Sequence, residues 1–343
     1  MGGTMAKANN HGVRAMLGIA LGVLAALASM PARAQEHANL AIPGRNMLFL
    51  SQYIADDEHL WQKQGLDVKI LYIVGIGSMN AVISGSADFS MSSGPSITRA
   101  NARGQKLVAL LTAINQSGQS IVVRKEIADQ AHFDPKAPLS VRGKILKGRT
   151  FAVGGAGAIP DIVLKVVAKD AGFAPNDVVA AAMQPPEFMA AFAAKKIDGF
   201  SNSPPFVEQT LLDGTGVLVS DSRIGEPKEY SPVSAALLLA RADYCPAHKD
   251  VCTKMVHGLF EATQIIRNDP KTALKAMKAH FGTYSDKVLE AAYQTVKAMT
   301  DAKPITTIQD LANSDNMNEA AGFIKASEKL TDYKPLIDNE YVK

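Results

Sequence analysis

An alternation of strand and helix patterns near the N-terminus restricts the fold of this chain more than any other feature. A short apolar strand is expected at 39–43, and apolar residues spaced as one face of a helix follow between 47 and 64. An alternating strand then runs over 66–73, and Asn46 and Gly65 are placed to cap the two ends of the helix. A strand, a helix and a strand within so short a segment predict a right-handed βαβ unit, which opens a parallel sheet.

A turn rich in glycine and serine follows this unit. The segment GIGSMNAVISGSADFSMSSG, residues 75–94, predicts a turn, a short helix, a glycine stop and a strand that ends in Ser92 and Ser93. Ser78 occupies the expected N-cap of the short helix, and Gly75 lets the backbone approach a ligand closely. Because ligands of open α/β sheets lie beyond the carboxyl ends of the strands, we expect a small polar molecule to bind here.

The rest of the chain repeats the α/β pattern and then becomes helical. Further strands are expected at 107–114, 120–124, 151–155, 178–182, 197–201, 217–220 and 233–240. Further helices are expected at 95–103, 160–171, 185–194, 205–212, 251–266, 270–281, 286–299 and 313–330. Prolines and scattered charge at 129–147 suit a surface connection. The chain is longer than single cores usually reach, so two lobes are expected.

The first 34 residues have the pattern of a secretory signal peptide. Lys7 and Arg14 precede an apolar run, and an A-x-A pattern that ends at Ala34 follows it. The run is shorter than a membrane span, so we expect cleavage after Ala34 and an exported mature chain that begins at Gln35. No cysteine lies near this junction to carry a lipid anchor.

Removal of this segment makes the chain electrically neutral. The whole sequence has 36 Lys and Arg against 33 Asp and Glu, and the first 34 residues hold three of the basic residues and no acidic one. The mature part therefore carries equal numbers of both. Its charge does not favour binding to nucleic acid or to an anionic membrane.

The two cysteines, Cys245 and Cys252, are close in the sequence. In an exported chain, a disulfide that closes this small loop is the leading interpretation. Free thiols, or a metal site that adds His248, are the alternatives, although a fourth metal ligand is missing. The histidines form no HxxxH or HExxH pattern, so no metal or cofactor is expected.

Signatures of common enzyme classes are missing from the sequence. There is no GxSxG elbow and no P-loop, and GIGSMN departs from the dinucleotide-binding pattern at its last position. The chain is therefore not expected to be an enzyme.

Three segments, YIADDEHLWQKQGLDVKI, GSMNAVISGSADFS and ANARGQKLVALLTAI, resemble a known family, and KGRTFAVGGAGAIPDIVLKVVAKDAGF does so more loosely. Together they are similar to the periplasmic solute-binding proteins of ABC importers for nitrate, sulfonate, taurine and thiamine-pyrimidine precursors. The resemblance implies an α/β, two-lobed type II periplasmic binding protein fold, in which each lobe is a mainly parallel sheet flanked by helices. It also implies a monomer that closes on a small-molecule solute and delivers it to an ABC permease in the inner membrane.

The same resemblance implies a division of the chain and a set of binding residues. Residues 1–34 are the signal peptide, 35–125 and 231–343 form the first lobe, and 126–230 form the second lobe. The family positions that line the cleft carry over to Arg45, Asn46, Ser78, Ser92, Ser93, Asn115, Gly155, Ala156, Gly157, Ala158, Ser201 and Asn202.

The turn at 154–158 departs from the family pattern. Relatives commonly have hydroxyl residues there, whereas this chain has only glycine and alanine, and Asp161 follows. Backbone N–H groups could still receive an anion, but a strongly anionic sulfonate is less favoured than usual. Arg45 is the first-lobe cation best placed to pair with a carboxylate.

Other interpretations of these residues and of the function stay open. Ser78 fits ordinary turn chemistry, Ser93 and Asn115 fit satisfied caps, and a solvated arginine is common where Arg45 stands.

Among the aromatic residues, Trp61 and Tyr53 favour the core, and Phe206 is a candidate to cover a ring. The chain could instead bind an aromatic carboxylate or another solute, or serve a membrane sensor. A pyrimidine synthase of this fold would need a cysteine-rich iron site, which two cysteines cannot supply.

Overall fold

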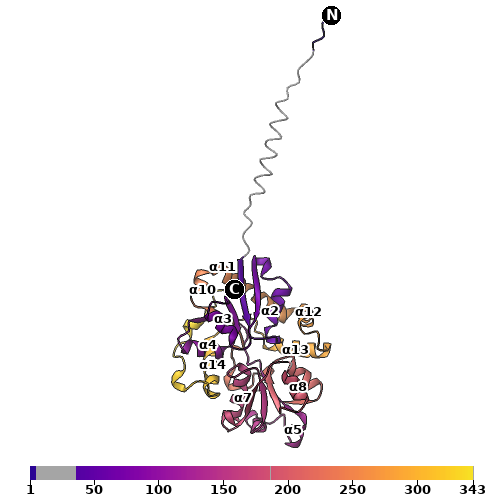
Figure 1. Cartoon of the computed structure of the whole chain (residues 1–343), viewed down its shortest axis with the longest axis vertical. Helices are drawn as coiled ribbons and strands as arrows, with labels where there is room; N and C mark the ends of the chain where they lie inside the picture. The colour runs from indigo at the N-terminus through magenta and orange to yellow at the C-terminus, as the bar shows by residue number, and fades with distance from the viewer. Residues whose placement is uncertain (5–35, 186, 343) are drawn as a thin grey trace. The chain divides into compact units, whose positions relative to one another are not determined.

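The computed structural model describes residues 1–4, 36–185 and 187–342. The predicted signal peptide and its cleavage after Ala34 therefore fall almost wholly outside the described residues. From Glu36 onward the chain forms two five-stranded sheets, each flanked by helices, which confirms the predicted two-lobed α/β fold (Figure 1).

The first sheet combines the N-terminal strands with a strand that returns from the second lobe. β1 is parallel to β2 and β3, whereas β10 runs antiparallel between β3 and β4. In spatial order the strands are β2 (Leu66–Tyr72), β1 (Glu36–Ile42), β3 (Phe89–Ser92), β10 (Ala236–Arg241) and β4 (Leu107–Ile114). The predicted βαβ start of a parallel sheet is therefore present.

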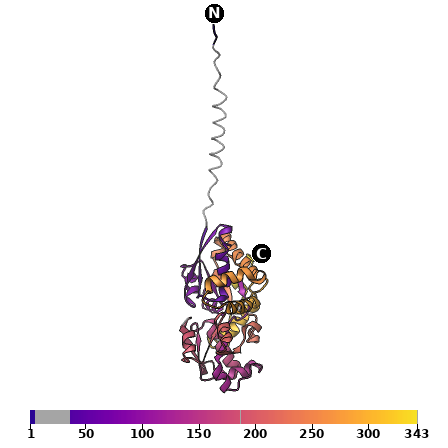
Figure 2. The same ribbon diagram turned by 90° about the vertical axis from the view of Figure 1, so that its right-hand side faces the viewer.

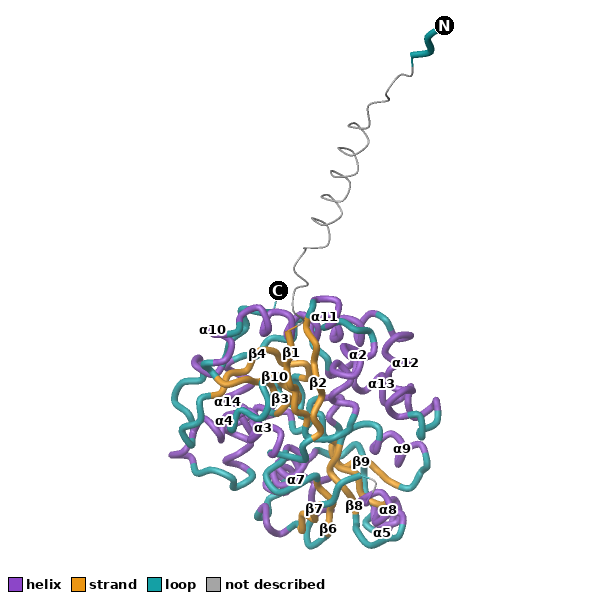
Figure 3. Tube along the Cα trace, turned by 45° about the horizontal axis from the view of Figure 1, so that its top comes forward, coloured by secondary structure: helices purple, strands orange, loops and turns teal. Residues whose placement is uncertain are grey.

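The second sheet repeats this arrangement. Three parallel strands are again followed by one antiparallel strand, here β5, and then by an edge strand (Figure 3). In spatial order the strands are β7 (Val179–Ala182), β6 (Thr150–Val153), β8 (Gly199–Asn202), β5 (Ser120–Arg124) and β9 (Gly216–Ser220). We expected residues 120–124 in the first lobe, but their strand pairs only within the second sheet. We therefore propose that the chain crosses between the lobes at 115–119 and at 221–235.

Helices cover both faces of each sheet. In Figure 2 the orange C-terminal helices pack beside the indigo N-terminal segment, where α11 and α12 both contact α2. The first-lobe helices are α2 (Leu50–Asp57), α3 (Gly77–Ile83), α4 (Gly94–Ala102), α10 (Tyr244–Ala247), α11 (Lys249–Asn268), α12 (Pro270–Phe281) and α13 (Asp286–Met299). The second-lobe helices are α5 (Lys125–Gln130), α6 (Leu139–Arg142), α7 (Ile159–Asp170), α8 (Glu187–Ala193) and α9 (Phe206–Leu212).

The last helix, α14 (Ile308–Ala320), contacts both lobes. It packs against α4 of the first lobe and α7 of the second, and Met317 and Ala320 are buried in the second-lobe core. The C-terminal segment, which we expected to pack on the first lobe alone, therefore joins the two. Short 3-10 helices complete the structure: η1 (Met47–Phe49), η2 (Gln62–Gln64), η3 (Gly143–Leu146), η4 (Pro175–Asp177), η5 (Ser222–Ile224), η6 (Lys228–Tyr230), η7 (Ala326–Glu328) and η8 (Lys334–Leu336).

Three expected elements differ from the structure. The helix expected at 47–64 is divided into η1, α2 and η2, with His59 at a φ of 55° between the last two. The connection expected at 129–147 contains α6 and η3. The helix expected at 313–330 is α14, which begins earlier because the side chains of Thr307 and Asp310 form a capping box at its start.

The aromatic residues of the first helix belong to the core, as predicted. Trp61 is fully buried, and its indole N–H donates to the backbone oxygen of Met255 at 3.1 Å. A Cβ on Gly258 would lie 2.3 Å from the Trp61 ring, so the bare backbone of α11 makes room for it. Tyr53 is likewise 1% exposed.

The predicted disulfide is present between Cys245 and Cys252, and it joins α10 to α11. Both cysteines are buried. We expect intact-mass spectrometry of the unfolded, unreduced mature chain to show the mass of a chain without the two thiol hydrogens. Reduction should restore them and expose both cysteines to an alkylating reagent. Alkylation of both cysteines before reduction would contradict the pairing.

Candidate functional site

A cavity of about 410 Å³ lies where the strands of the two sheets end. Pro43 follows β1 and Ser93 follows β3 in the first lobe, while Gly154 follows β6 and Ser203 follows β8 in the second. Since the carboxyl ends of parallel strands of both lobes point to the cavity, it occupies the place where α/β sheets bind ligands.

The structure brings some of the predicted binding residues together and leaves others outside the cavity. Those that line it are Arg45, Asn46, Ser78, Ser92, Ser93, Ala158 and Asn202. Those that do not line it are Asn115, Gly155, Ala156, Gly157 and Ser201.

The residues outside the cavity have other partners or positions. The Asn115 side-chain amide donates to the Asp301 carboxylate at 2.6 Å. Ser201 is fully buried within β8, which ends one residue later than expected. The N–H of Gly157 donates to Oδ2 of Asp161 at 2.8 Å, so this turn is fixed by its own helix.

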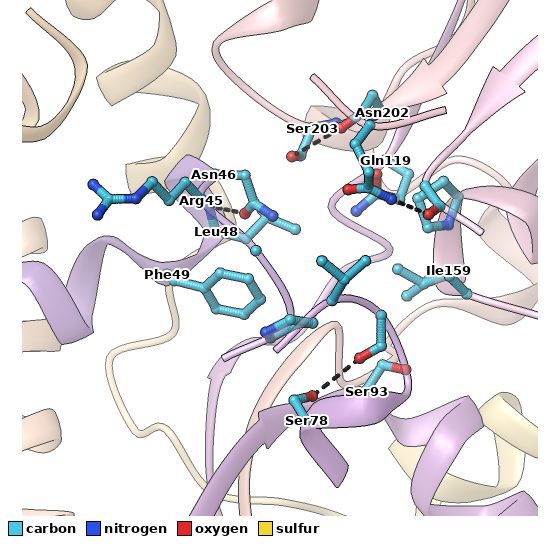
Figure 4. A pocket seen from close by; sticks show the side chains of 18 of the residues that line it. Arg45, Asn46, Leu48, Phe49, Ser78, Ser93, Gln119, Ile159, Asn202 and Ser203 are labelled. Atoms are coloured by element: carbon cyan, nitrogen blue, oxygen red, sulfur yellow. Dashed lines mark hydrogen bonds between the residues drawn. The ribbon is translucent and has the colours of Figure 1, made fainter. Parts of the chain in front are cut away.

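Two serines in the cavity wall have roles different from the expected ones. α3 begins at Gly77, so Ser78 lies inside the helix and not at its N-cap, and its hydroxyl donates to the Gly75 oxygen at 3.1 Å. Ser93 stands at the N-cap of α4 but makes no side-chain cap, because its hydroxyl pairs with that of Ser96 at 3.0 Å. Figure 4 shows Ser78 and Ser93 on the same side of the cavity.

Several lining residues were not predicted from the sequence. Gln119 is 3% exposed, and its buried Oε1 has no hydrogen-bond partner among the described residues. Gln184, which follows β7 of the second lobe, also lines the cavity and donates through Nε2 to the Gly154 oxygen. Ser93 was predicted because it is a polar residue next to the end of a strand, and Gln184 has the same signal. Gln119 instead precedes its strand, β5, which we had expected in the first lobe, so the same signal did not identify it.

Most of the remaining wall is apolar. Phe49 and Phe206 are each 4% exposed, and Phe206 packs edge-on against Phe188 with ring centroids 5.1 Å apart. Phe206 therefore lines the cavity, and its role in covering a ring stays a prediction. The apolar lining residues are Pro43, Leu48, Phe49, Tyr72, Val74, Ile76, Ile159, Pro160, Pro185, Phe206 and Ala235.

Arg45 is the one charged side chain among the described residues that line the cavity. It is exposed, and its guanidinium lies 4.3 Å from the centroid of the Tyr72 ring, which is itself 42% exposed. In Figure 4 the Arg45 side chain extends away from Asn46 and Leu48. The positive charge therefore lies at the mouth of the cavity and not in its interior.

A half-buried arginine links the two lobes. Arg99 of α4 donates to the Gly157 oxygen of the second lobe at 2.6 Å and to Asn318 of α14 at 2.8 Å. Burial lowers the pKa of Arg99 to about 10, so the guanidinium stays charged at neutral pH. These bonds fix the turn before α7 against the first lobe.

A second, smaller cavity of about 210 Å³ lies between α9 and α13. Glu208 accepts a hydrogen bond from the Thr295 hydroxyl at 2.7 Å, while its other oxygen is buried without a partner in the described residues. Burial raises the pKa of the Glu208 carboxyl above its usual value of 4.5. The folded state therefore holds this proton more tightly than the unfolded state does. The resulting stability is complete below the unfolded pKa and is lost as the pH rises through the raised pKa.

We expect Glu208→Gln to remove this loss, because glutamine keeps the acceptor for Thr295 and carries no charge. Urea unfolding from about pH 4 to pH 8 should show the variant gaining stability over the parent as the pH rises. Glu261→Gln, at an exposed position of α11, is the control and should follow the parent curve. Parallel curves for Glu208→Gln and the parent would contradict the raised pKa.

The described residues show no site for a metal ion and no membrane-spanning helix. Nowhere in 36–185 or 187–342 do three or more His, Cys, Asp or Glu side chains gather to hold a metal ion. Within the same part of the chain, no helix combines the length and the apolar character that a membrane span requires.

Two α/β lobes with a lined cavity between them define the fold class of the periplasmic binding proteins. The sequence model of the NMT1-like family matches residues 47–280, which is more than half of the chain. The chain therefore belongs to the NMT1-like family. A comparison with curated proteins gives no match.

Solved structures support the same fold. A protein from Bordetella bronchiseptica RB50 is 20% identical, with a TM-score of 0.79 over 90% of this chain and 96% of that one. The alkanesulfonate-binding protein SsuA from Xanthomonas axonopodis pv. citri, bound to MOPS, is 17% identical, with a TM-score of 0.66 over 84% and 94%. The nitrate-binding protein NrtA from Synechocystis PCC 6803 is 14% identical, with a TM-score of 0.61 over 85% and 83%.

Proposed function

We propose that the mature protein is the periplasmic solute-binding component of an ABC importer. It captures one small organic or oxyanionic solute between its lobes and delivers it to a permease in the inner membrane. The observation that carries this proposal is the 410 Å³ cavity, to which both lobes contribute lining residues. A cavity divided between two lobes closes by a hinge motion, which buries the solute and gives the permease a distinct liganded shape.

Three further observations support the proposal. The N-terminal sequence has the pattern of a secretory signal peptide, which supports export to the periplasm with cleavage after Ala34. The structures of similar fold include proteins named for binding alkanesulfonate and nitrate. The family match and the missing enzyme motifs agree with a protein that binds its solute and makes no bond in it. We further propose that it acts as a monomer and binds no nucleic acid, in keeping with its balanced charge.

A thermal-shift screen of the mature chain tests this function. The panel holds sulfonates, nitrate, pyrimidines and aromatic acids, each added over a range of concentrations. A true solute at 100 times its dissociation constant should stabilise the fold by roughly 2.7 kcal/mol. A panel in which no compound moves the melting temperature would contradict the proposal.

A further inference from the structure

We propose that the cavity selects a ring-bearing monocarboxylate that also carries a hydrogen-bond donor. The ring and the donor are buried, and the carboxylate stays at the mouth beside Arg45. This inference rests on the proposed function and narrows its solute class.

The interior of the cavity does not suit a small oxyanion. Apart from Arg45 at the mouth, every described lining residue is uncharged. An anion that enters such a site loses its hydration without gaining an ion pair, and that loss is costly. The volume of about 410 Å³ lies in the range of sites for organic ligands, and a nitrate ion would leave most of it unfilled.

The N-terminus of α4, on the first-lobe side, has no free N–H group with which to replace the missing charge. At the start of α4, the Gly94 N–H donates to the Ser234 oxygen at 2.7 Å, and Pro95 has none. The Ser96 N–H, the third of this turn, lies 3.0 Å from the Ser93 oxygen. The usual anion site of a helix N-terminus is therefore already occupied.

The N-terminus of α7, on the second-lobe side, is similarly compensated. Pro160 in its first turn has no N–H, and the preceding Gly157 N–H is bound to Asp161. Asp161 is 1% exposed and brings a carboxylate to the end of the helix that would otherwise attract an anion. Lys165 lies 3.1 Å from that carboxylate, so Asp161 is paired within its own helix.

The apolar walls favour a ring. Phe49 of the first lobe and Phe206 of the second are both almost fully buried, and Ile159 is part of the same lining. Rigid aromatic and branched side chains from two lobes form a slot that excludes water around a planar body. Burial of a ring against them supplies the affinity that an uncharged interior cannot supply by ion pairing.

The neutral amides predict a hydrogen-bond donor on the ring. Gln119 belongs to the lining, and its buried Oε1 accepts no hydrogen bond among the described residues, so we expect it to accept one from a donor group of the solute. The side-chain oxygens of Asn46 and Asn202 already accept from the N–H groups of Leu48 and Ser203, at 3.0 and 2.9 Å. Their NH2 groups remain to donate to an oxygen of the solute (Figure 4).

The mouth of the cavity suits one negative charge. Arg45 makes no ion pair with any described residue, and its guanidinium is held over the Tyr72 ring. A carboxylate there keeps part of its hydration and gains charge-assisted hydrogen bonds. A solute that enters ring first therefore passes the exposed cation and places its ring in the apolar slot, its donor at the buried acceptor and its carboxylate at the mouth beside Arg45.

Isothermal titration of the mature chain with a matched set of compounds tests the inference. The probes are 3- and 4-hydroxybenzoate, benzoate without the donor, 4-hydroxybenzamide without the charge, and taurine and nitrate as small ions. We expect one hydroxybenzoate isomer to bind tightest. Benzoate should bind at least about tenfold more weakly because the Gln119 oxygen stays unpaired, and the benzamide about tenfold more weakly because it lacks the charge.

Two variants assign these preferences to their residues. Gln119→Leu should remove the preference for the hydroxyl and keep the preference for the carboxylate. Arg45→Gln changes an exposed position that the fold does not need. It should remove the preference for the carboxylate and keep the preference for the hydroxyl. Thermal melting without solute checks that each variant is folded, and the Arg45 variant tests the proposal even if Gln119→Leu does not fold.

The outcomes separate the inference from the proposed function. Tighter binding of taurine or nitrate than of every ring carboxylate would overturn the inference and leave solute binding intact. Equal affinities for the three kinds of ring compound, unchanged in both variants, would overturn the roles of Gln119 and Arg45. Failure of every compound, here and in the wider thermal-shift panel, would overturn the proposed function as well.

Discussion

Replacement of Ala158 by tryptophan is expected to abolish solute binding while the protein stays folded. Ala158 lines the cavity from the second lobe, at the N-cap of α7. An indole at this position fills space that the solute needs, whereas the backbone keeps its extended conformation, with φ at −73° and ψ at 160°. The stabilisation of roughly 2.7 kcal/mol expected at 100 times the dissociation constant should therefore disappear.

Ala156→Trp is the matched control for this variant. Ala156 belongs to the same turn, is exposed and does not line the cavity. The control should bind the best-stabilising compound as the parent does. If the solute stabilised Ala158→Trp as much as the parent, the solute would bind elsewhere. If both variants lost the stabilisation equally, the loss would come from a disturbed turn and not from a filled cavity.

Substitution of Gly199 by alanine is expected to destabilise the second lobe severely. Gly199 lies in β8 between β6 and β5, opposite Phe151 and Val123. An added Cβ would lie 2.2 Å from the Val122 backbone oxygen and 2.3 Å from the buried Phe151 ring. Neither neighbour can move without disturbing the sheet, so we expect a loss of about 3 kcal/mol or more in the free energy of unfolding.

Urea unfolding of Gly199→Ala against Gly155→Ala measures this effect. An added Cβ on Gly155 meets no atom within 4 Å, and the residue does not have a positive φ. That control should stay within roughly 0.5 kcal/mol of the parent. A similar small loss for Gly199→Ala would mean that the sheet accepts the extra atom and that the packing between β8 and Phe151 is looser than described.

Much of the fold could be predicted because it depends on local patterns. β4, β5, α12 and α13 match their expected ranges, since strand alternation, helix spacing and proline or serine starts lie within each segment. The lobe that β5 joins could not be predicted in this way. It depends on pairing with β8 and β9, strands much later in the chain, which no local pattern specifies.

The cavity was predicted better in the first lobe than in the second for the same reason. Asn46 and Ser93 follow strands whose ends are evident in the sequence, and both line the cavity. Asn115 also follows a strand, but its partner Asp301 is 186 residues away along the chain. Gln119 lines the cavity only because its strand turns back into the second lobe. Such contacts follow from the way the two lobes meet.

A crystal structure of the mature chain with its best-stabilising solute tests the central claim most directly. The account predicts one solute molecule per chain in the cavity between the lobes, within hydrogen-bond distance of Gln119 and in contact with Phe49 and Phe206. A solute bound outside this cavity, with the space between the lobes holding only water, would contradict it.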